Sequence, residues 1–249
     1  MNRKKSDNYY DVHWENFKDV DIPDVKLKKA QLFFDPIAKM LQPGMKVLDI
    51  GCGNGVHWRY LQQVFGGDGQ YCGIDSSTEA IAHLNAPEKS PTSRFSVQDA
   101  CDLQFSDSEF DVVFAYGVLG YTDEPALAFR EMVRVCSKGG LIGVFSPEIT
   151  GVNKLVLDIT RSIAAVSCDR GKRTLADVLV PFYGLASSGT RISLLNSSWS
   201  QVREVILTNI APEKLEIIKH QLFIEWVDEL GLEIVFNDQR SPTFIWLRK

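Results

Sequence analysis

The sequence has 249 residues, of which 45% are hydrophobic and 24% are charged, and this composition is typical of one large globular domain or one domain with an insertion. The net charge of −5 argues against a broad nucleic-acid-binding surface, since such surfaces are usually basic. Five scattered cysteines without CxxC spacing indicate reduced thiols of a cytoplasmic protein rather than disulfides or a metal site. They are Cys52, Cys72, Cys101, Cys136 and Cys168.

Neither a membrane span nor a signal peptide is expected. No apolar run approaches the ~20 residues that a bilayer span needs. The charged start of the chain, residues 1–7, is not followed by an apolar run.

Residues 1–40 are expected to form an N-terminal cap segment. Its first 24 residues are polar and contain a cluster of aromatic residues with Tyr10 and His13. From residue 25 to residue 41, apolar residues recur at helical spacing. Pro36 interrupts this pattern, so either the helix kinks there or Asp35 caps a second short helix with Pro36 at its first position.

The next segment is a short apolar strand, residues 47–50, followed directly by Gly51, Gly53 and Gly55 and then by helical spacing. A strand, a glycine turn and a helix in this order point free backbone N–H groups at an anionic group. A dinucleotide-binding fingerprint would need a glycine where Val56 stands, and a phosphate loop would need a Gly-Lys-Ser/Thr triplet, which is absent.

A second strand, residues 70–74, ends in Asp75, which lies 24 residues after Gly51. This spacing is close to the ~20 residues expected for a carboxylate that meets a ribose. Ser76 and Glu79 have the spacing of a capping box and predict a helix that runs to about residue 85.

The same alternation of strands and helices continues to residue 145. Strands are expected at residues 94–98, 110–115 and 141–145, with a helix at 125–136 and a turn at Lys138-Gly139-Gly140. Regular alternation of this kind indicates a parallel sheet that is covered by helices on both faces.

After residue 147 the alternation stops. An amphipathic helix over residues 152–163, a loop around 181–190 and a helix over 198–208, with Ser198 and Gln201 at capping-box spacing, are expected there. A helix over 222–230 and two antiparallel strands, 232–236 and 244–247, then complete the sheet. We therefore predict one α/β domain with a doubly wound, mostly parallel sheet and a C-terminal antiparallel hairpin. Its segments are 1–40, the core 41–149, a helical lid insertion 150–211, and the final helix and hairpin 212–249.

Four spaced motifs resemble the common methyltransferase domain of class I S-adenosylmethionine (SAM)-dependent methyltransferases of the small-molecule type. They are VLDIGCGNG, GIDSS, FSVQDACDLQFSDSEFDVVFAYGVLGY and FREMVRVCSKGGLIGVF, within residues 47–145. The last motif departs from the family pattern at Cys136-Ser137-Lys138, which replaces Leu-x-Pro in a turn. The resemblance implies a seven-stranded Rossmann-like fold, with SAM and its product S-adenosylhomocysteine at the carboxyl ends of the first, second and fourth strands.

The resemblance also implies a set of cofactor-binding residues. Asp49 would organise the glycine loop, Asp75 would accept from the ribose hydroxyls, and Asp99 would accept from the adenine amino group. Asp75 and Asp99 could instead be caps, and Tyr116 could be plain packing. The whole set is Tyr10, Asp49, Gly51, Cys52, Gly53, Asp75, Ser76, Asp99, Ala100, Cys101, Tyr116 and Gly117.

A methyl acceptor with a hydroxyl group would benefit from a general base. The side chains considered for this role are His13, His57, Tyr121 and Glu148, although His57 could also be a solvated residue of the first helical turn and Glu148 a surface residue.

The acceptor is predicted to be a small, partly apolar molecule that residues 1–40 and 150–211 recognise. The methyl group would be transferred to an O, N or C atom of this molecule. Nucleic acid is not expected, and no clustered spacing suggests a metal. Two alternatives stay open. One is an RNA- or protein-directed methyltransferase, which would need a basic surface around residues 170–173; the other is an inactive SAM-fold partner subunit.

Overall fold

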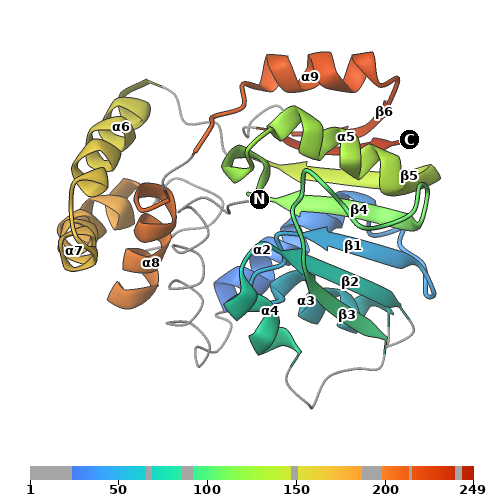
Figure 1. Ribbon diagram of the computed structural model, residues 1–249, viewed down its shortest axis with the longest axis horizontal. Coiled ribbons are helices and arrows are strands. Elements are labelled where there is room, and N and C mark those ends of the chain that lie inside the picture. Colours follow the sequence, from blue (N-terminus) through green and yellow to red (C-terminus); the bar gives the residue numbers. More distant parts are fainter. Residues whose placement is uncertain are drawn as a thin grey trace. The chain divides into compact units, whose positions relative to one another are not determined.

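The computed structural model describes residues 24–65, 69–85, 92–146, 151–186, 198–212, 215–238 and 243–249. The chain divides into two compact units, one formed by Met1–Glu148 with Glu216–Lys249 and the other by Ile149–Leu215. Figure 1 shows the elements of both. Tyr10, His13 and Glu148 lie outside the described residues, so the predictions for them stay predictions.

The first unit contains a seven-stranded sheet in the order β3-β2-β1-β4-β5-β7-β6. The five strands β1 to β5 run parallel, and β7 runs antiparallel to both of its neighbours, β5 and β6. The predicted doubly wound, mostly parallel sheet with a C-terminal antiparallel hairpin is therefore confirmed. The strands are β1 Lys46–Ile50, β2 Gln70–Asp75, β3 Ser93–Val97, β4 Phe110–Tyr116, β5 Cys136–Phe145, β6 Glu233–Asn237 and β7 Phe244–Arg248.

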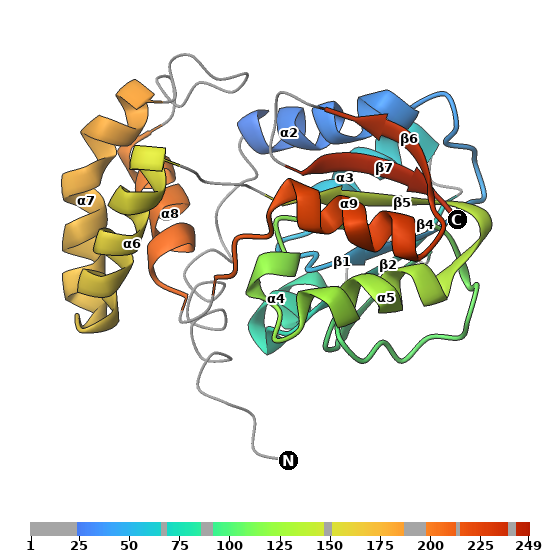
Figure 2. The same cartoon turned by 90° about the horizontal axis from the view of Figure 1, so that it is seen from above.

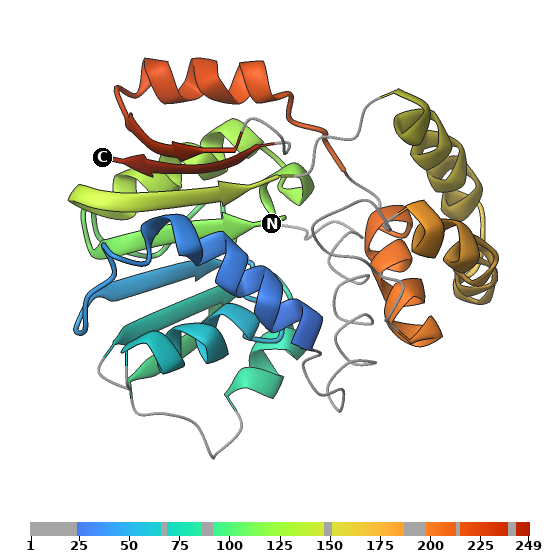
Figure 3. The same cartoon turned by 180° about the vertical axis from the view of Figure 1, so that it is seen from behind.

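Helices cover both faces of this sheet. Figures 2 and 3 show α5 and α9 on one face and α2 and α3 on the other. The strands are apolar on both faces because each face carries its own layer of helices. The helical elements of this unit are α2 Asp24–Phe34, η1 Asp35–Ile37, α3 Val56–Phe65, α4 Thr78–Leu84, η2 Leu119–Tyr121, α5 Pro125–Val135 and α9 His220–Glu229.

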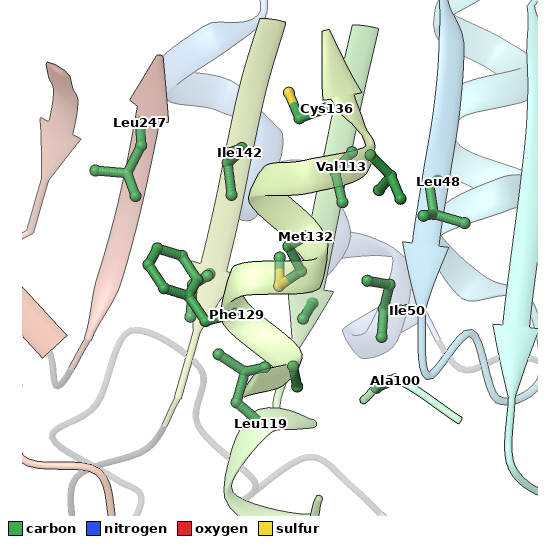
Figure 4. Close-up of a cluster of buried hydrophobic side chains, with 14 of the residues drawn as sticks. Leu48, Ile50, Ala100, Val113, Leu119, Phe129, Met132, Cys136, Ile142 and Leu247 are labelled. Atoms are coloured by element: carbon green, nitrogen blue, oxygen red, sulfur yellow. The ribbon is translucent and has the colours of Figure 1, made fainter. Parts of the chain in front are cut away.

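Alternate residues of each strand belong to separate cores. On the face covered by α5, Phe129 and Met132 belong to the same buried cluster as Val113 and Ile142 of the central strands (Figure 4). The opposite core is rich in aromatic rings, and there the Trp246 indole nitrogen donates to the backbone oxygen of Phe33 at 2.8 Å. This bond ties α2 to the C-terminal strand.

Two predicted helix starts are one residue off. Helix α2 ends at Phe34, and a short 3₁₀ helix, Asp35–Ile37, follows with Pro36 in its first turn; its N-cap is Phe34 rather than Asp35. Helix α4 is capped by Ser77 rather than by Ser76, because the Ser77 hydroxyl accepts from the amide of Ala80 at 3.2 Å. Ser76 is exposed.

The predicted turn at residues 138–140 is part of a strand. Strand β5 begins at Cys136, and its pairing with β4 shifts register between Phe110 and Val112. Gly139 has φ +80° and its amide donates to the carbonyl of Lys249 at 2.8 Å. The glycines therefore form an irregularity inside the strand, held by the C-terminal residue, and not a turn before it.

The second unit contains three helices among its described residues: α6 Gly151–Ala165, α7 Asp169–Ala186 and α8 Trp199–Ile210. The expected helices at 152–163 and 198–208 match α6 and α8. The prediction that a loop starts at about residue 181 is wrong, because helix α7 continues through Pro181 to Ala186. Pro181 removes one helical hydrogen bond, yet the buried side chains of Ala176 and Val180 fix the helix within the unit.

A single arginine links two helices of this unit. The Arg161 guanidinium on α6 donates to the carbonyl oxygen of Asn209, in the last turn of α8, at 2.7 Å and to that of Pro212, beyond the helix, at 2.9 Å. Among the described residues, no helix is long and apolar enough to cross a membrane.

Candidate functional site

The site begins at the glycine turn between β1 and α3. Gly51, Gly53 and Gly55 all have positive φ angles, +72°, +51° and +74°, which L residues with a Cβ rarely adopt. At Gly51 there is also no room for a side chain, because a Cβ there would lie 2.3 Å from Cγ2 of Val118. The turn therefore brings the ends of β1 and β4 into direct contact.

The sequence pattern predicted free amides in this turn, but four of them donate to acceptors within the protein. Gly51 and Cys52 both donate to the carbonyl oxygen of Ile74, at 2.8 and 2.9 Å, and Gly55 donates to Cys52 at 2.9 Å. Gly53 donates to the Asp75 carboxylate at 2.9 Å. These four N–H groups are engaged within the protein, so this part of the turn fastens β1 to the end of β2.

Asp75 lies at the end of β2, beside this turn. Its two carboxylate oxygens accept from the amides of Gly53 and Ser77, at 2.9 and 3.0 Å. Burial raises the pKa of the Asp75 carboxyl, and the two amides oppose part of that rise. A carboxylate oxygen has two acceptor sites, so Asp75 keeps capacity for two further donors, such as vicinal hydroxyls.

Asp49, on β1 directly before the turn, is fully buried. One of its oxygens, Oδ2, accepts from the hydroxyl of Tyr71 on β2. The other, Oδ1, has no hydrogen-bond donor among the described residues. A buried acceptor without a donor is costly, so this oxygen is a candidate partner for a donor group from outside the described residues.

Tyr71 is a site residue that sequence analysis missed. It is buried, and burial together with the charge of Asp49 holds the pKa of its phenol well above the usual range. Tyr71 is therefore a protonated donor that orients Asp49. The only sequence signal for it is a tyrosine hydroxyl within a strand that is otherwise apolar.

His57, in the first turn of α3, is not a solvated residue. Its side chain is only 12% exposed, and Nδ1 lies 3.4 Å from Asp49 Oδ2. The ring packs against Phe114 and Tyr116, with centroids 5.2 and 5.1 Å away. His57 thus belongs to the polar cluster under the glycine turn, and its role as a base stays a prediction.

Tyr116, the last residue of β4, packs in an aromatic layer. Its ring stacks on Phe145 at 4.4 Å and meets Phe33 edge-on at 5.2 Å. Burial raises the pKa of Tyr116 to about 12, so the phenol stays protonated at neutral pH. Gly117 follows with φ +71°, and a Cβ there would meet no atom within 4 Å.

Asp99, Ala100 and Cys101 follow β3, next to the end of β2. Asp99 is exposed, and one of its oxygens accepts from the Cys101 amide at 2.8 Å, so it does act as a turn cap. The Gln98 amide donates to the backbone oxygen of Asp75 at 3.1 Å and joins the two strand ends. The assignment of Asp99 to an adenine amino group stays a prediction.

The remaining predicted residues of this unit are Cys52, Ser76 and Tyr121. Cys52 is buried, and burial raises the pKa of its thiol well above the usual range. Tyr121 is partly buried in η2. The described residues contain no group of three His, Cys, Asp or Glu side chains that could hold a metal ion.

This geometry sits inside a segment that known proteins share. A family described as "Methyltransferase domain" matches residues 48–144. That segment contains the glycine turn, Asp75, Asp99 and the end of β4. Residues 48–144 are a methyltransferase domain of the class I SAM-dependent family.

Two curated methyltransferases are similar to part of this chain. The 2-methyl-6-phytyl-1,4-hydroquinone methyltransferase of Synechocystis sp. is 36% identical over 107 residues, 42% of this chain and 32% of that protein. The arsenite methyltransferase of Aquipseudomonas alcaligenes is 29% identical over 114 residues, 42% of this chain and 33% of that protein. The chain thus spans about a third of the length of these relatives.

A solved structure shares the fold of the whole chain. The crystal structure of a candidate S-adenosyl-L-methionine-dependent methyltransferase from Methanococcus maripaludis superposes with a TM-score of 0.55 at 16% identity. It covers 100% of this chain and 96% of that one. The methyltransferase domain therefore has the fold that its motifs predict.

Proposed function

We propose that the protein is a SAM-dependent methyltransferase that transfers a methyl group by in-line displacement to an O, N or C atom of a small, partly apolar molecule. One observation carries the choice of cofactor. Four amides of the glycine turn donate within the protein, and the two carboxylates beside it, Asp49 and Asp75, are acceptors. Such a site suits a cationic nucleoside and disfavours a pyrophosphate.

The acceptors divide the cofactor between them in this proposal. Asp75 accepts from the two ribose hydroxyls while the Gly53 and Ser77 amides hold it in place. Asp49 Oδ1 accepts from the ammonium of the methionine portion, and the Tyr71 hydroxyl fixes the carboxylate plane. An ammonium gives the buried carboxylate both a donor and an opposite charge.

SAM supplies an activated methyl group, so the protein has little covalent chemistry to perform. The chain holds the nucleophile and the reacting carbon in line, and positioning of this kind can contribute ~7–11 kcal/mol. Tyr116 stays protonated, which suits a packing or donor role and not a base. His57 and Tyr121 remain proposed bases for a hydroxyl acceptor.

The acceptor class is inferred separately from the cofactor. One relative is named for a phytyl hydroquinone and another for arsenite, and each is similar to 42% of this chain. We assign recognition of the acceptor to the segments outside the methyltransferase domain, including residues 150–211. Within the proposal the protein is cytoplasmic and acts on a small molecule.

The cofactor is tested by titrating S-adenosylhomocysteine into the protein by calorimetry, with NADH in parallel. We expect saturable binding of S-adenosylhomocysteine only, and at least a tenfold loss (~1.4 kcal/mol) in Asp75→Ala. Asp228→Ala is the matched control, since Asp228 is exposed on α9, and it should bind like the wild type. Unchanged binding in Asp75→Ala, or preferred binding of NADH, would refute the assignment.

The acceptor is tested by transfer of a labelled methyl group to apolar phenols and quinols, to arsenite, and to RNA and protein pools. Transfer to a small organic acceptor supports the proposal. Transfer to RNA or protein alone would favour the first alternative, and binding of SAM with no transfer to any pool would favour an inactive partner subunit.

A further inference from the structure

Helix α6 has apolar side chains on two opposite faces. One face, with Leu157, Thr160 and Ala164, is buried within the second unit. The opposite face is exposed, and its apolar side chains are between 43% and 88% exposed. We call these residues the α6 stripe: Leu155, Val156, Ile159, Ile163 and Val166, the last of which directly follows the helix.

The spacing of the α6 stripe shows that it is a continuous surface. Leu155, Ile159, Ile163 and Val166 recur at i, i+4, i+8 and i+11, so they lie along one side of the helix. The side of a surface helix that faces solvent is normally polar. A contiguous apolar face of this kind marks a binding surface.

The charge of this unit indicates what binds there. Residues 149–215 contain eight Lys and Arg and five Asp and Glu, a net charge of +3, whereas the rest of the chain carries −8. Arg170 and Arg173, at the start of α7 just beyond Val166, are exposed. Neither has a carboxylate within ion-pair distance among the described residues, in contrast to Lys172, which lies 3.9 Å from Asp169.

We propose that the α6 stripe docks on the surface of an anionic lipid bilayer. An interfacial helix combines an apolar face, which enters the boundary of the acyl chains, with basic residues that meet anionic headgroups. A second copy of this unit fits less well, because a symmetric contact would bring one charge of +3 against another. This surface would hold the protein at the face of a membrane.

The test is co-sedimentation of the full chain with vesicles of phosphatidylcholine alone or with about a third of phosphatidylglycerol. We expect binding to the anionic vesicles that weakens in high salt. Ile159→Gln/Ile163→Gln should lower the partition coefficient at least tenfold, and Arg170→Gln/Arg173→Gln should lower binding to the anionic vesicles only. The matched control is Ile234→Gln on β6, since Ile234 is 43% exposed and Ile163 is 47% exposed.

Three results would overturn the proposal. They are no binding to anionic vesicles, an equal loss in the Ile234→Gln control, and a dimer in gel filtration that only the α6 variant dissociates. Circular dichroism checks that the variants fold. Val166→Ser gives a second probe that leaves the helix intact, because Val166 is 88% exposed and lies beyond the end of α6, and it should also weaken vesicle binding.

Discussion

Asp49→Asn is the sharpest perturbation of the proposed cofactor site. Asp49 is fully buried, with one oxygen on the Tyr71 hydroxyl and the other without a donor. In the variant the single amide oxygen is needed by Tyr71, so the NH₂ group takes the place of the free oxygen. The NH₂ donor then faces the ligand ammonium, so the ammonium loses both its hydrogen-bond acceptor and the opposite charge of the carboxylate.

The expected size follows from the chemistry of that contact. A hydrogen bond to a charged group contributes about 1.5–3 kcal/mol, which corresponds to about a tenfold to hundredfold loss of affinity. The folded protein without ligand should be as stable as the wild type or more so, because a buried charge is removed while the Tyr71 hydroxyl keeps an acceptor. Asp49→Asn should therefore lower the affinity for the ligand without lowering the free energy of unfolding of the ligand-free protein.

The assay compares two ligands by calorimetry. S-adenosylhomocysteine carries the ammonium, whereas 5′-methylthioadenosine lacks the whole amino-acid portion. We expect Asp49→Asn to weaken the first and to leave the second within about twofold. Equal weakening of both ligands would show that Asp49 acts only by organising the glycine loop, and would refute the ammonium contact while leaving the adenosine site in place.

Three further outcomes test the same region. Tyr71→Phe should cost about 1.5–3 kcal/mol in urea unfolding, since a buried carboxylate oxygen loses its donor, and an unchanged midpoint would contradict that bond. Gly51→Ala should abolish S-adenosylhomocysteine binding, because the new Cβ would lie 2.3 Å from Val118. The control is Gly44→Ala, at φ +84° with no atom within 4 Å of the new Cβ; it should lower the free energy of unfolding by only about 1–2 kcal/mol and leave binding unchanged. Burial raises the pKa of Asp75, so acidification protonates this carboxylate and removes the acceptor at a higher pH than for an ordinary aspartate; affinity should fall in that higher range, and Asp75→Asn should flatten this profile.

The elements that the sequence could predict are those with local signals. The strands of the parallel sheet are short apolar runs bounded by turn residues, and the final helix does end before Gly231, at φ +65°. Helix α7 was missed because its beginning has mixed polarity and Pro181 resembles a loop. There the tertiary packing of Ala176 and Val180 outweighs the local cost of the proline.

The site shows the same division between local and long-range information. The glycines and Asp75 are readable from spacing, but the Tyr71–Asp49 bond depends on strand register. Tyr71 pairs with Val47, two residues before Asp49, so only the parallel alignment of β1 and β2 places the hydroxyl beside the carboxylate. Likewise, the closeness of Gly51 and Val118 depends on β4 lying next to β1.

The glycine turn illustrates how one sequence pattern serves two kinds of ligand. In a phosphate-binding loop the turn amides stay open to an anion. Here the amides of Gly51 and Cys52 donate to the carbonyl of Ile74, and the amide of Gly53 donates to Asp75. In our proposal the groups that meet the ligand are therefore the carboxylates beside the turn. Removal of the negative charge by Asp49→Asn should weaken binding of a cationic nucleoside and leave a pyrophosphate no better bound, because the Gly51, Cys52 and Gly53 amides keep their acceptors in this variant.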